Sequence, residues 1–364
     1  MRPTSGGSGG TPPLPPPGWY PDPSDPAMQR YFDGHNWTSH CVPAPAPPFS
    51  AQPTPPGWYP DPSGYAGQRY FDGHNWTSQR SPAEQRTVRL QQKKPESQSF
   101  SVDREASNRR KARLESYLSD EVWNPRHGFI CQSGPDCHSS AAKCGASFYE
   151  AQGHMVGPYY DMEVGGRPFR VVVLPMETGE PKQHRTIDQR TKDVLDSAEL
   201  SFGQRNPHMK GVTFALRLAF GLPVDEDVEH IRLDDGSRVH LFETYAMTNL
   251  LLCSAVDEGT MKSRSTSIMR RSCARHMRAT IGILQPTLVI SQGAGLRPTL
   301  EATLGVRKAV TDDVALCDLD GNQFVWVSLR HPSRGNWHSL KCAYLHEVVV
   351  PAITAGRQLA LRQM

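Results

Sequence analysis

A histidine that follows an apolar run is the first group in this sequence that could do chemistry. Residues 325–329 have strand character, and the chain continues through Arg330 into His331-Pro332-Ser333 and a Gly-Asn-Trp-His loop. In open α/β sheets, ligands bind at the carboxyl ends of the strands. The pattern therefore predicts an imidazole at the edge of a sheet, where it could donate a hydrogen bond to a ligand.

Cysteines form the second group with possible chemistry. Cys131, Cys137 and Cys144 precede the first predicted strand of a large domain, whereas Cys253 and Cys273 come much later. The N-terminus lacks the pattern of a secretory leader, so we expect free thiols or metal ligands and no disulfide framework. Four thiolates from distant segments suit an iron–sulfur cluster, and zinc accepts the same ligands. Composition does not choose between the two.

The elements that must position these groups lie in residues 113–364. Strand-like runs at residues 169–174, 245–252, 287–291 and 324–329 alternate with helix-like stretches, which include 212–220, 267–284 and 344–362. Repeated alternation of this kind predicts an α/β fold with a mostly parallel central sheet and helices on both faces.

The N-terminal part of the chain has a different organisation. Residues 1–16 are mostly Gly, Ser, Thr and Pro and are expected to be disordered. Residues 17–40 recur as residues 56–79, and each copy has two Trp residues and an Asp-Gly turn. The pattern predicts two small β-hairpin modules, which resemble a short Trp-rich bacterial domain of unknown function and, in shape, the WW-type modules. Their aromatic residues either bind a peptide or protein or only form the core of a small fold.

Two linkers complete this part. Residues 41–55 form a Pro-rich linker, and residues 80–112 form a basic one. The basic linker could contact DNA phosphates without reading sequence, or it could simply be solvated.

Composition sets limits on partners and location. The 364 residues carry a formal net charge of +3, so any affinity for nucleic acid must come from local patches. The sequence has no apolar run of about 18 residues, the length that a membrane helix needs. We therefore expect a cytoplasmic monomer that does not enter a membrane.

The order of motifs in the large domain adds a resemblance. Asn249 stands four residues before Cys253, Cys273 follows on a predicted helix, and residues 284–293 read Leu-x-Pro-x-x-apolar-apolar-x-x-Gly. Together with the His-Pro-Ser motif, this series resembles the iron–sulfur (family 4-like) uracil-DNA glycosylases. The resemblance implies an enzyme that flips uracil or a related damaged base out of DNA and hydrolyses its N-glycosidic bond.

The family motifs imply roles for residues around the base. Asn249 would pair with the base edge, His208 would replace a stacking aromatic residue, and His331 would lie beside the uracil O2. The first motif falls at residues 175–180, where Gly179 would help to bind the base and Glu177 or Glu180 would orient water. Asn249 could instead be a strand-end cap that binds backbone.

Further roles concern DNA and the metal. Ser333 would hold a phosphate, and Arg334 or Trp337 would fill the gap left by the flipped nucleotide. Arg271 and Arg275 lie on a basic helix that would contact phosphates or form a solvated face. The resemblance favours a [4Fe-4S] cluster whose ligands would be Cys137, Cys144, Cys253 and Cys273. Cys131 is a competing ligand, and zinc is the alternative metal.

Two rival functions remain open because the first motif departs from the family pattern. Residues 175–180 read Pro-Met-Glu-Thr-Gly-Glu, and the family has a Gly-Glu-x-Pro-Gly loop at this place. The protein could be an inactive relative that binds nucleic acid or a nucleobase. It could also be a metal-stabilised interaction protein that acts through its tandem repeats.

Overall fold

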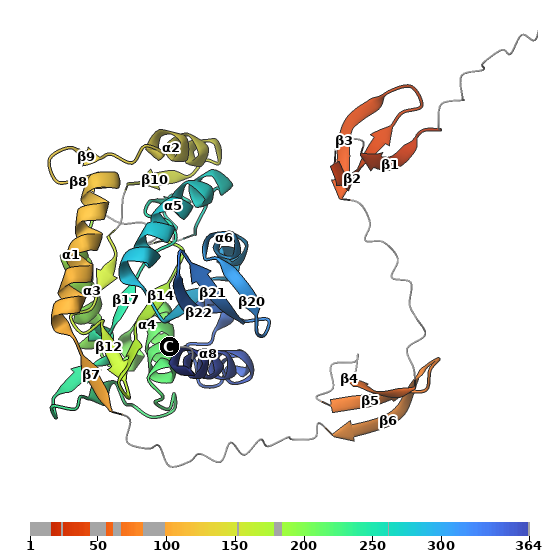
Figure 1. The fold of residues 1–364 in the computed structure, drawn as a ribbon. Coiled ribbons are helices and arrows are strands. Elements are labelled where there is room, and N and C mark those ends of the chain that lie inside the picture. The colour runs from red at the N-terminus through yellow and green to blue at the C-terminus, as the bar shows by residue number, and fades with distance from the viewer. Residues whose placement is uncertain are drawn as a thin grey trace, which may run out of the picture. The chain divides into compact units, whose positions relative to one another are not determined.

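A computed structural model describes residues 16–22, 25–43, 56–60, 67–82, 99–150, 153–177, 184–260 and 262–362. The chain divides into two units, Met1–Lys93 and Lys94–Met364 (Figure 1).

Each N-terminal repeat is a three-stranded antiparallel sheet, so the predicted small β modules are present and have one strand more than a hairpin. Their strands are β1 (Gly18–Asp22), β2 (Asp25–Phe32), β3 (Trp37–Pro43), β4 (Gly57–Pro60), β5 (Gly67–Phe71) and β6 (Trp76–Pro82). In the first repeat, Oδ1 of Asp33 accepts hydrogen bonds from the N–H groups of Asn36 and His35 at 2.6 and 2.7 Å. Asp72 closes the matching turn of the second repeat in the same way.

The second unit is built on a seven-stranded sheet in the order β11-β17-β14-β19-β22-β21-β20. Its four central strands run parallel: β17 (Tyr245–Met247), β14 (Val171–Leu174), β19 (Leu288–Gln292) and β22 (Asn322–Leu329). The outer strands are antiparallel to their neighbours: β11 (Met155–Val156), β21 (Val314–Leu319) and β20 (Val306–Ala309). The α/β class is confirmed, and the mostly parallel sheet is corrected to a mixed one.

Helices cover both faces of this sheet, as predicted (Figure 1). Side chains alternate between the two faces of a strand. Val171 and Val173 of β14 therefore pack into the core beneath α4 (Pro207–Ala219) and α8 (Val350–Arg362). Val172 and Leu174 pack into the other core, which α1 (Arg104–Glu121), α5 (Ser267–Leu284) and α6 (Arg297–Thr303) cover.

Smaller elements complete the unit. The helices are α2 (Gly134–Lys143), α3 (Ile187–Ala198) and α7 (Pro332–Gly335). Short 3-10 helices lie at Phe202–Gln204, Leu241–Glu243 and Ala294–Leu296, and a π-helix at Leu345–Val349 precedes α8. The strands are β7 (Phe100–Val102), β8 (Trp123–Asn124), β9 (Gly128–Phe129), β10 (Ser147–Tyr149), β12 (Met162–Val164), β13 (Arg167–Phe169), β15 (His230–Arg232), β16 (Arg238–His240) and β18 (Ser254–Val256). No helix within the described ranges is long and apolar enough to cross a membrane.

The segment assigned to the basic linker, residues 80–112, contains the end of β6, the whole of β7 and the first half of α1. The Asp103 side chain caps α1 by accepting a hydrogen bond from the Ala106 N–H at 2.8 Å. Leu114 of this helix is fully buried against the sheet. The folded unit therefore starts well before residue 113.

Candidate active site and thiol-lined pocket

A cleft of about 600 Å³ lies beyond the carboxyl ends of the parallel strands. Its walls come from segments that follow β14, β17 and β22 and from the start of α4. Ligands bind at this edge in open α/β sheets. The cleft brings together six of the residues singled out in the sequence: Glu177, His208, Asn249, His331, Ser333 and Arg334.

His331 enters the cleft from the end of β22 and caps α7. The Ser333 backbone N–H donates to its Nδ1 at 3.2 Å. Burial, with Arg334 nearby, lowers the pKa of His331, so the imidazole is neutral at neutral pH. Because Nδ1 accepts a hydrogen bond, the proton of the neutral ring lies on Nε2. His331 is thus a neutral hydrogen-bond donor.

His208 lies opposite His331, in the first turn of α4. The Asn206 side chain caps this helix by accepting from the Met209 N–H at 2.9 Å. The His208 and His331 rings are almost parallel, with their planes 14° apart and their centroids separated by 5.8 Å. Burial, His331 and Arg190 lower the pKa of His208 to about 3, and its Nδ1 has no partner among the described residues.

Asn249 is held in the cleft by backbone pairing that continues beyond β17. The N–H groups of Leu250 and Leu251 donate to the carbonyls of Pro175 and Met176 at 2.9 and 2.8 Å. Asn249 is only 4% exposed. The predicted strand 245–252 is wrong at its end, because β17 stops at Met247 and the chain then follows the segment after β14.

Glu177 forms the wall contributed by the first motif. Its Oε2 accepts a hydrogen bond from the Ala255 N–H at 3.1 Å, and its Oε1 is buried with no partner among the described residues. Burial raises the pKa of Glu177, against the opposing effects of Ser263, Ala255 and Arg270. A carboxylate with a raised pKa is a stronger base toward water. Gly179 and Glu180 lie outside the described residues.

Trp337 does not lie in the cleft. It is fully buried, and its Nε1–H donates to the Arg330 carbonyl at 2.7 Å. A Cβ at Gly211 of α4 would stand 3.1 Å from the Trp337 ring, so the indole fills the space beside that helix. The proposed insertion of Trp337 into DNA is therefore corrected, because the side chain is part of the core. Arg334 is exposed at the rim of the cleft.

Sequence reasoning missed two polar residues at this edge of the sheet. Arg190 of α3 lines the cleft, and its Nε is buried with no partner among the described residues. Gln292 ends β19 on the side to which Leu288 and Ile290 point, and both polar atoms of its fully buried amide lack partners within the described ranges. A polar side chain at the carboxyl end of an apolar strand was the signal that could have found Gln292.

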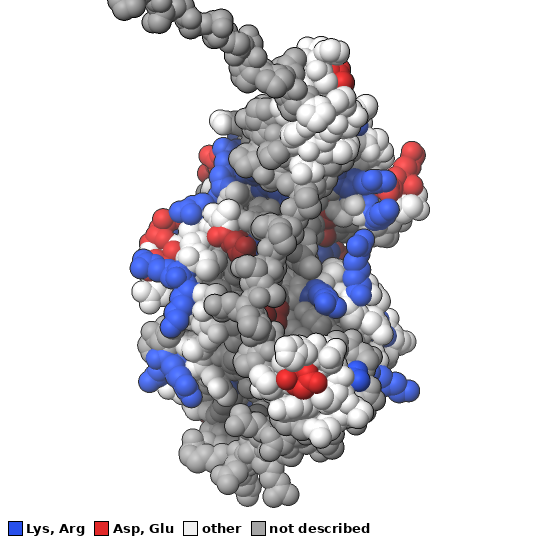
Figure 2. Space-filling model, turned by 90° about the vertical axis from the view of Figure 1, so that its right-hand side faces the viewer, with Lys and Arg blue, Asp and Glu red and all other residues white. Residues whose placement is uncertain are grey.

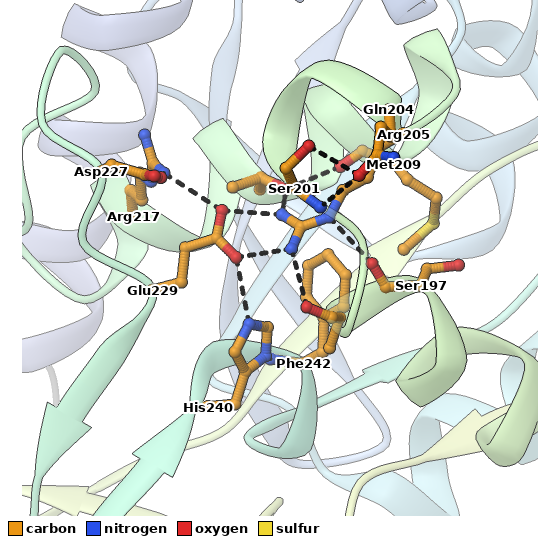
Figure 3. Close-up of polar contacts among 12 residues, drawn as sticks. Ser197, Ser201, Gln204, Arg205, Met209, Arg217, Asp227, Glu229, His240 and Phe242 are labelled. Carbon is orange, nitrogen blue, oxygen red and sulfur yellow. Dashed lines mark hydrogen bonds and ion pairs between the residues drawn. The ribbon is translucent and has the colours of Figure 1, made fainter.

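A buried ionic network supports the start of α4 (Figure 3). His208 lies in the first turn of this helix. Arg205, which precedes the helix cap, forms two hydrogen bonds with Glu229 at 2.7 and 2.6 Å. Arg217 and His240 also contact this carboxylate, at 3.1 and 3.0 Å. Burial would raise the pKa of Glu229, but these partners lower it to about 2. The network therefore ties the cleft wall to the segment before β15.

The structure separates one of the predicted metal ligands from the others. Cys131, Cys137, Cys253 and Cys273 line one small pocket, together with apolar side chains. Cys144 is exposed at the end of α2, seven residues and about 10 Å of helix beyond Cys137. The structure therefore places Cys131, the competing ligand, with the other three predicted ligands, and Cys144 away from them. Metal binding by these thiols stays a prediction.

The chemistry of this pocket fits a thiolate-bound metal centre. It offers four thiols and no carboxylate, which suits iron–sulfur clusters and zinc. Burial raises the pKa of Cys273 to about 12 and raises that of Cys137 as well, so both are neutral thiols without a cation. Within the described ranges, no three His, Cys, Asp or Glu side chains already stand in a chelating arrangement.

The basic residues of α5 lie on its outer face. Arg271 and Arg275 are exposed, whereas Cys273 and His276 of the same helix are buried. His276 is only 2% exposed and does not belong to this outer basic face. On the face shown in Figure 2, basic and acidic side chains of the described residues are interspersed. DNA contact through Arg271 and Arg275 stays a prediction.

Comparison with known proteins identifies the repeats. No curated protein matches the chain. The resemblance of the large domain to uracil-DNA glycosylases stays a prediction. Residues 17–50 and 56–89 match the family described as "Protein of unknown function (DUF2510)", which confirms that the N-terminal part holds two copies of a short domain of unknown function.

Proposed function

We propose that the large unit is a DNA glycosylase that hydrolyses the N-glycosidic bond of uracil or a related damaged base flipped out of DNA. One observation carries the proposal. Segments after three parallel strands bring Glu177, Asn249 and His331 into a single cleft.

In this proposal His331 stabilises the leaving group. As the bond from C1′ to the base nitrogen breaks, its electron pair moves into the base and negative charge grows on O2. A neutral imidazole with its proton on Nε2 can donate to that oxygen without giving up the proton. The hydrogen bond from Ser333 to Nδ1 supports this role because it fixes the tautomer.

Asn249 and Glu177 complete the reaction. The Asn249 amide has one donor and one acceptor for the N3–H and O4 of uracil. The Glu177 carboxylate can accept a proton from the water that attacks C1′, which leaves an abasic sugar and the free base. The unpartnered Oε1 of Glu177 supports this role.

The proposal includes a [4Fe-4S] cluster held by Cys131, Cys137, Cys253 and Cys273. When bound, the cluster would cross-link the segment before α2, α2 itself, the loop after β17 and α5, and would add one-electron chemistry. The loop after β17 also carries Asn249, so the cluster ligand Cys253 would fix the backbone that presents this amide. Zinc is the alternative metal for the same ligands.

The repeats are proposed to bind a peptide or protein. In the first repeat Trp19 and Trp37 are 43% and 41% exposed, although Trp19 packs edge-on against Tyr31 at 5.3 Å. Exposed aromatic residues on a small sheet are typical of modules that bind extended, Pro-rich segments. This role would place the glycosylase near a partner and would not alter its chemistry.

A single-turnover assay tests the glycosylase. Excess full-length protein is mixed with a uracil-containing oligonucleotide, and abasic product is measured for the wild type, His331→Ala and His127→Ala. Loss of an oxyanion donor is expected to slow His331→Ala by about 10²–10³-fold. His127 is exposed on the loop before β9, so its variant should match the wild type. The absence of abasic product with the wild type would contradict the proposal and favour an inactive relative.

A further inference from the structure

The thiol-lined pocket contains an imidazole that the glycosylase proposal leaves unused. His276 of α5 lines the pocket beside the four cysteines. It lies three residues after Cys273, and the two side chains share one buried face of the helix, at 2% and 7% exposure.

Both ring nitrogens of His276 have specific neighbours. Nε2 lies 3.5 Å from the Cys131 sulfur, and Nδ1 lies 2.8 Å from the Tyr117 hydroxyl. Tyr117 belongs to α1, and burial raises its pKa, so the hydroxyl keeps its proton and can donate it to Nδ1. An imidazole that accepts at Nδ1 carries its own proton on Nε2. That proton points toward the Cys131 sulfur.

Four thiols already supply the ligands that a cubane cluster requires, so the imidazole is left over for a supporting role. Cys131 also has a second polar neighbour. The guanidinium of Arg275, the residue before His276 on α5, lies 4.0 Å from the Cys131 sulfur. Both neighbours are hydrogen-bond donors, which stabilise a thiolate.

We propose that His276 is the outer hydrogen-bond donor of the metal centre, with its Nε2–H bound to the Cys131 sulfur and its Nδ1 held by the Tyr117 hydroxyl. Hydrogen bonds to cluster sulfurs favour the more negatively charged, reduced state and so raise the reduction potential. His276 is thus a positioning and tuning residue. The inference rests on the proposed cluster and is independent of glycosylase activity.

The test is a potentiometric titration of the full-length protein, reconstituted with iron and sulfide without oxygen and followed by absorbance and electron paramagnetic resonance. His276→Phe removes the donor. We expect it to keep its iron and to be reduced about tenfold less readily, which is a potential about 59 mV more negative for a one-electron couple. His276→Gln keeps an N–H group and should recover part of the shift.

Two further variants make the test specific. Tyr117→Phe should shift the reduction potential in the same direction by a smaller amount. If His276→Phe does not fold, the potential of Tyr117→Phe is the measurement that decides. His138→Phe is the matched control, because His138 is exposed on α2 and packs edge-on against Phe148. Its potential should equal that of the wild type.

Several results would overturn the inference. One is an unchanged potential in His276→Phe with full iron content. Another is equal loss of iron in His276→Phe and His276→Gln, which would identify the imidazole as a direct ligand. A wild-type protein that takes up zinc and no iron, or a cluster with no one-electron step, would also contradict it. An inactive glycosylase with the predicted potentials would leave it standing.

Discussion

A thiol can ligate a metal only where its sulfur can approach the other ligands, and in this respect Cys131 and Cys144 differ. Cys131 lines the pocket with Cys253 and Cys273, whereas Cys144 faces solvent two turns of helix beyond Cys137. We predict that Cys131→Ser loses most of its iron and its absorbance near 400 nm, and that Cys144→Ser keeps both. Elemental analysis for iron and zinc after anaerobic purification measures the difference. The reverse result would restore Cys144 to the ligand set.

Gln292 illustrates the cost of a buried amide without partners. Its side chain is fully buried, and neither polar atom has a hydrogen-bond partner among the described residues. An unsatisfied buried polar group costs about 1–3 kcal/mol. We therefore predict that Gln292→Met, which is similar in volume, raises the free energy of unfolding by about 1–3 kcal/mol in denaturant titrations.

A second Gln→Met variant provides the control for Gln292. Gln358 is exposed on α8, so Gln358→Met should change the free energy of unfolding by no more than about 0.5 kcal/mol. If Gln292→Met destabilises the protein, the amide must be satisfied in solution by bound water or by a ligand in the neighbouring cleft.

At the scale of elements, the sequence predicts correctly those helices whose first residue and buried face are determined by nearby residues. The helix predicted at residues 267–284 has the same bounds as α5. Thr266 caps it, and its buried residues recur at helical spacing from Met269 to Leu284. The meeting of Glu177, Asn249 and His331 was also predictable, because the carboxyl ends of neighbouring parallel strands share one edge.

Elements that depend on distant contacts were not predictable. α1 has few apolar residues, and its burial depends on Leu114 meeting the sheet core, so its first half resembled a charged linker. β17 ends at Met247 because Leu250 and Leu251 pair with the segment after β14. Nothing near Trp337 in the sequence indicates that its ring will pack beside Gly211.

The ionic network behind α4 makes an element-scale prediction. Glu229 is the shared partner of two buried arginines, and its side chain is 12% exposed. We predict that Glu229→Gln lowers the free energy of unfolding by about 3–5 kcal/mol at neutral pH, because it leaves Arg205 buried without an anion. Asp227→Asn is the matched control: its carboxylate pairs with Arg217 but is 84% exposed, so the loss should stay below about 1 kcal/mol.

The same network sets a pH dependence. The folded-state pKa of Glu229 is about 2, below the value of about 4.3 expected in an unfolded chain. A lowered pKa gives stability that is fully present above about pH 4.3 and is lost as the pH falls toward 2. Denaturant midpoints between pH 5 and pH 3 should therefore fall more steeply for the wild type than for Glu229→Gln. Parallel curves would contradict the assignment.

At the scale of the whole molecule, described residues of the large unit form that unit's hydrophobic core. The buried residues of its hydrophobic clusters all lie between Phe100 and Ala360. None of the described residues of the unit Met1–Lys93 belongs to these clusters. We predict that removing residues 1–93 leaves the denaturant midpoint and the iron content of the large unit unchanged. The rate of abasic-site formation on a short uracil-containing oligonucleotide should also stay the same, because every residue assigned to that reaction lies in the large unit.

Equal catalysis with loss of a binding partner in pull-down experiments would give the repeats a recruiting role. A large fall in rate on the same short substrate would show instead that the repeats or the basic segment before β7 help to hold DNA, an effect that should then weaken as salt is added.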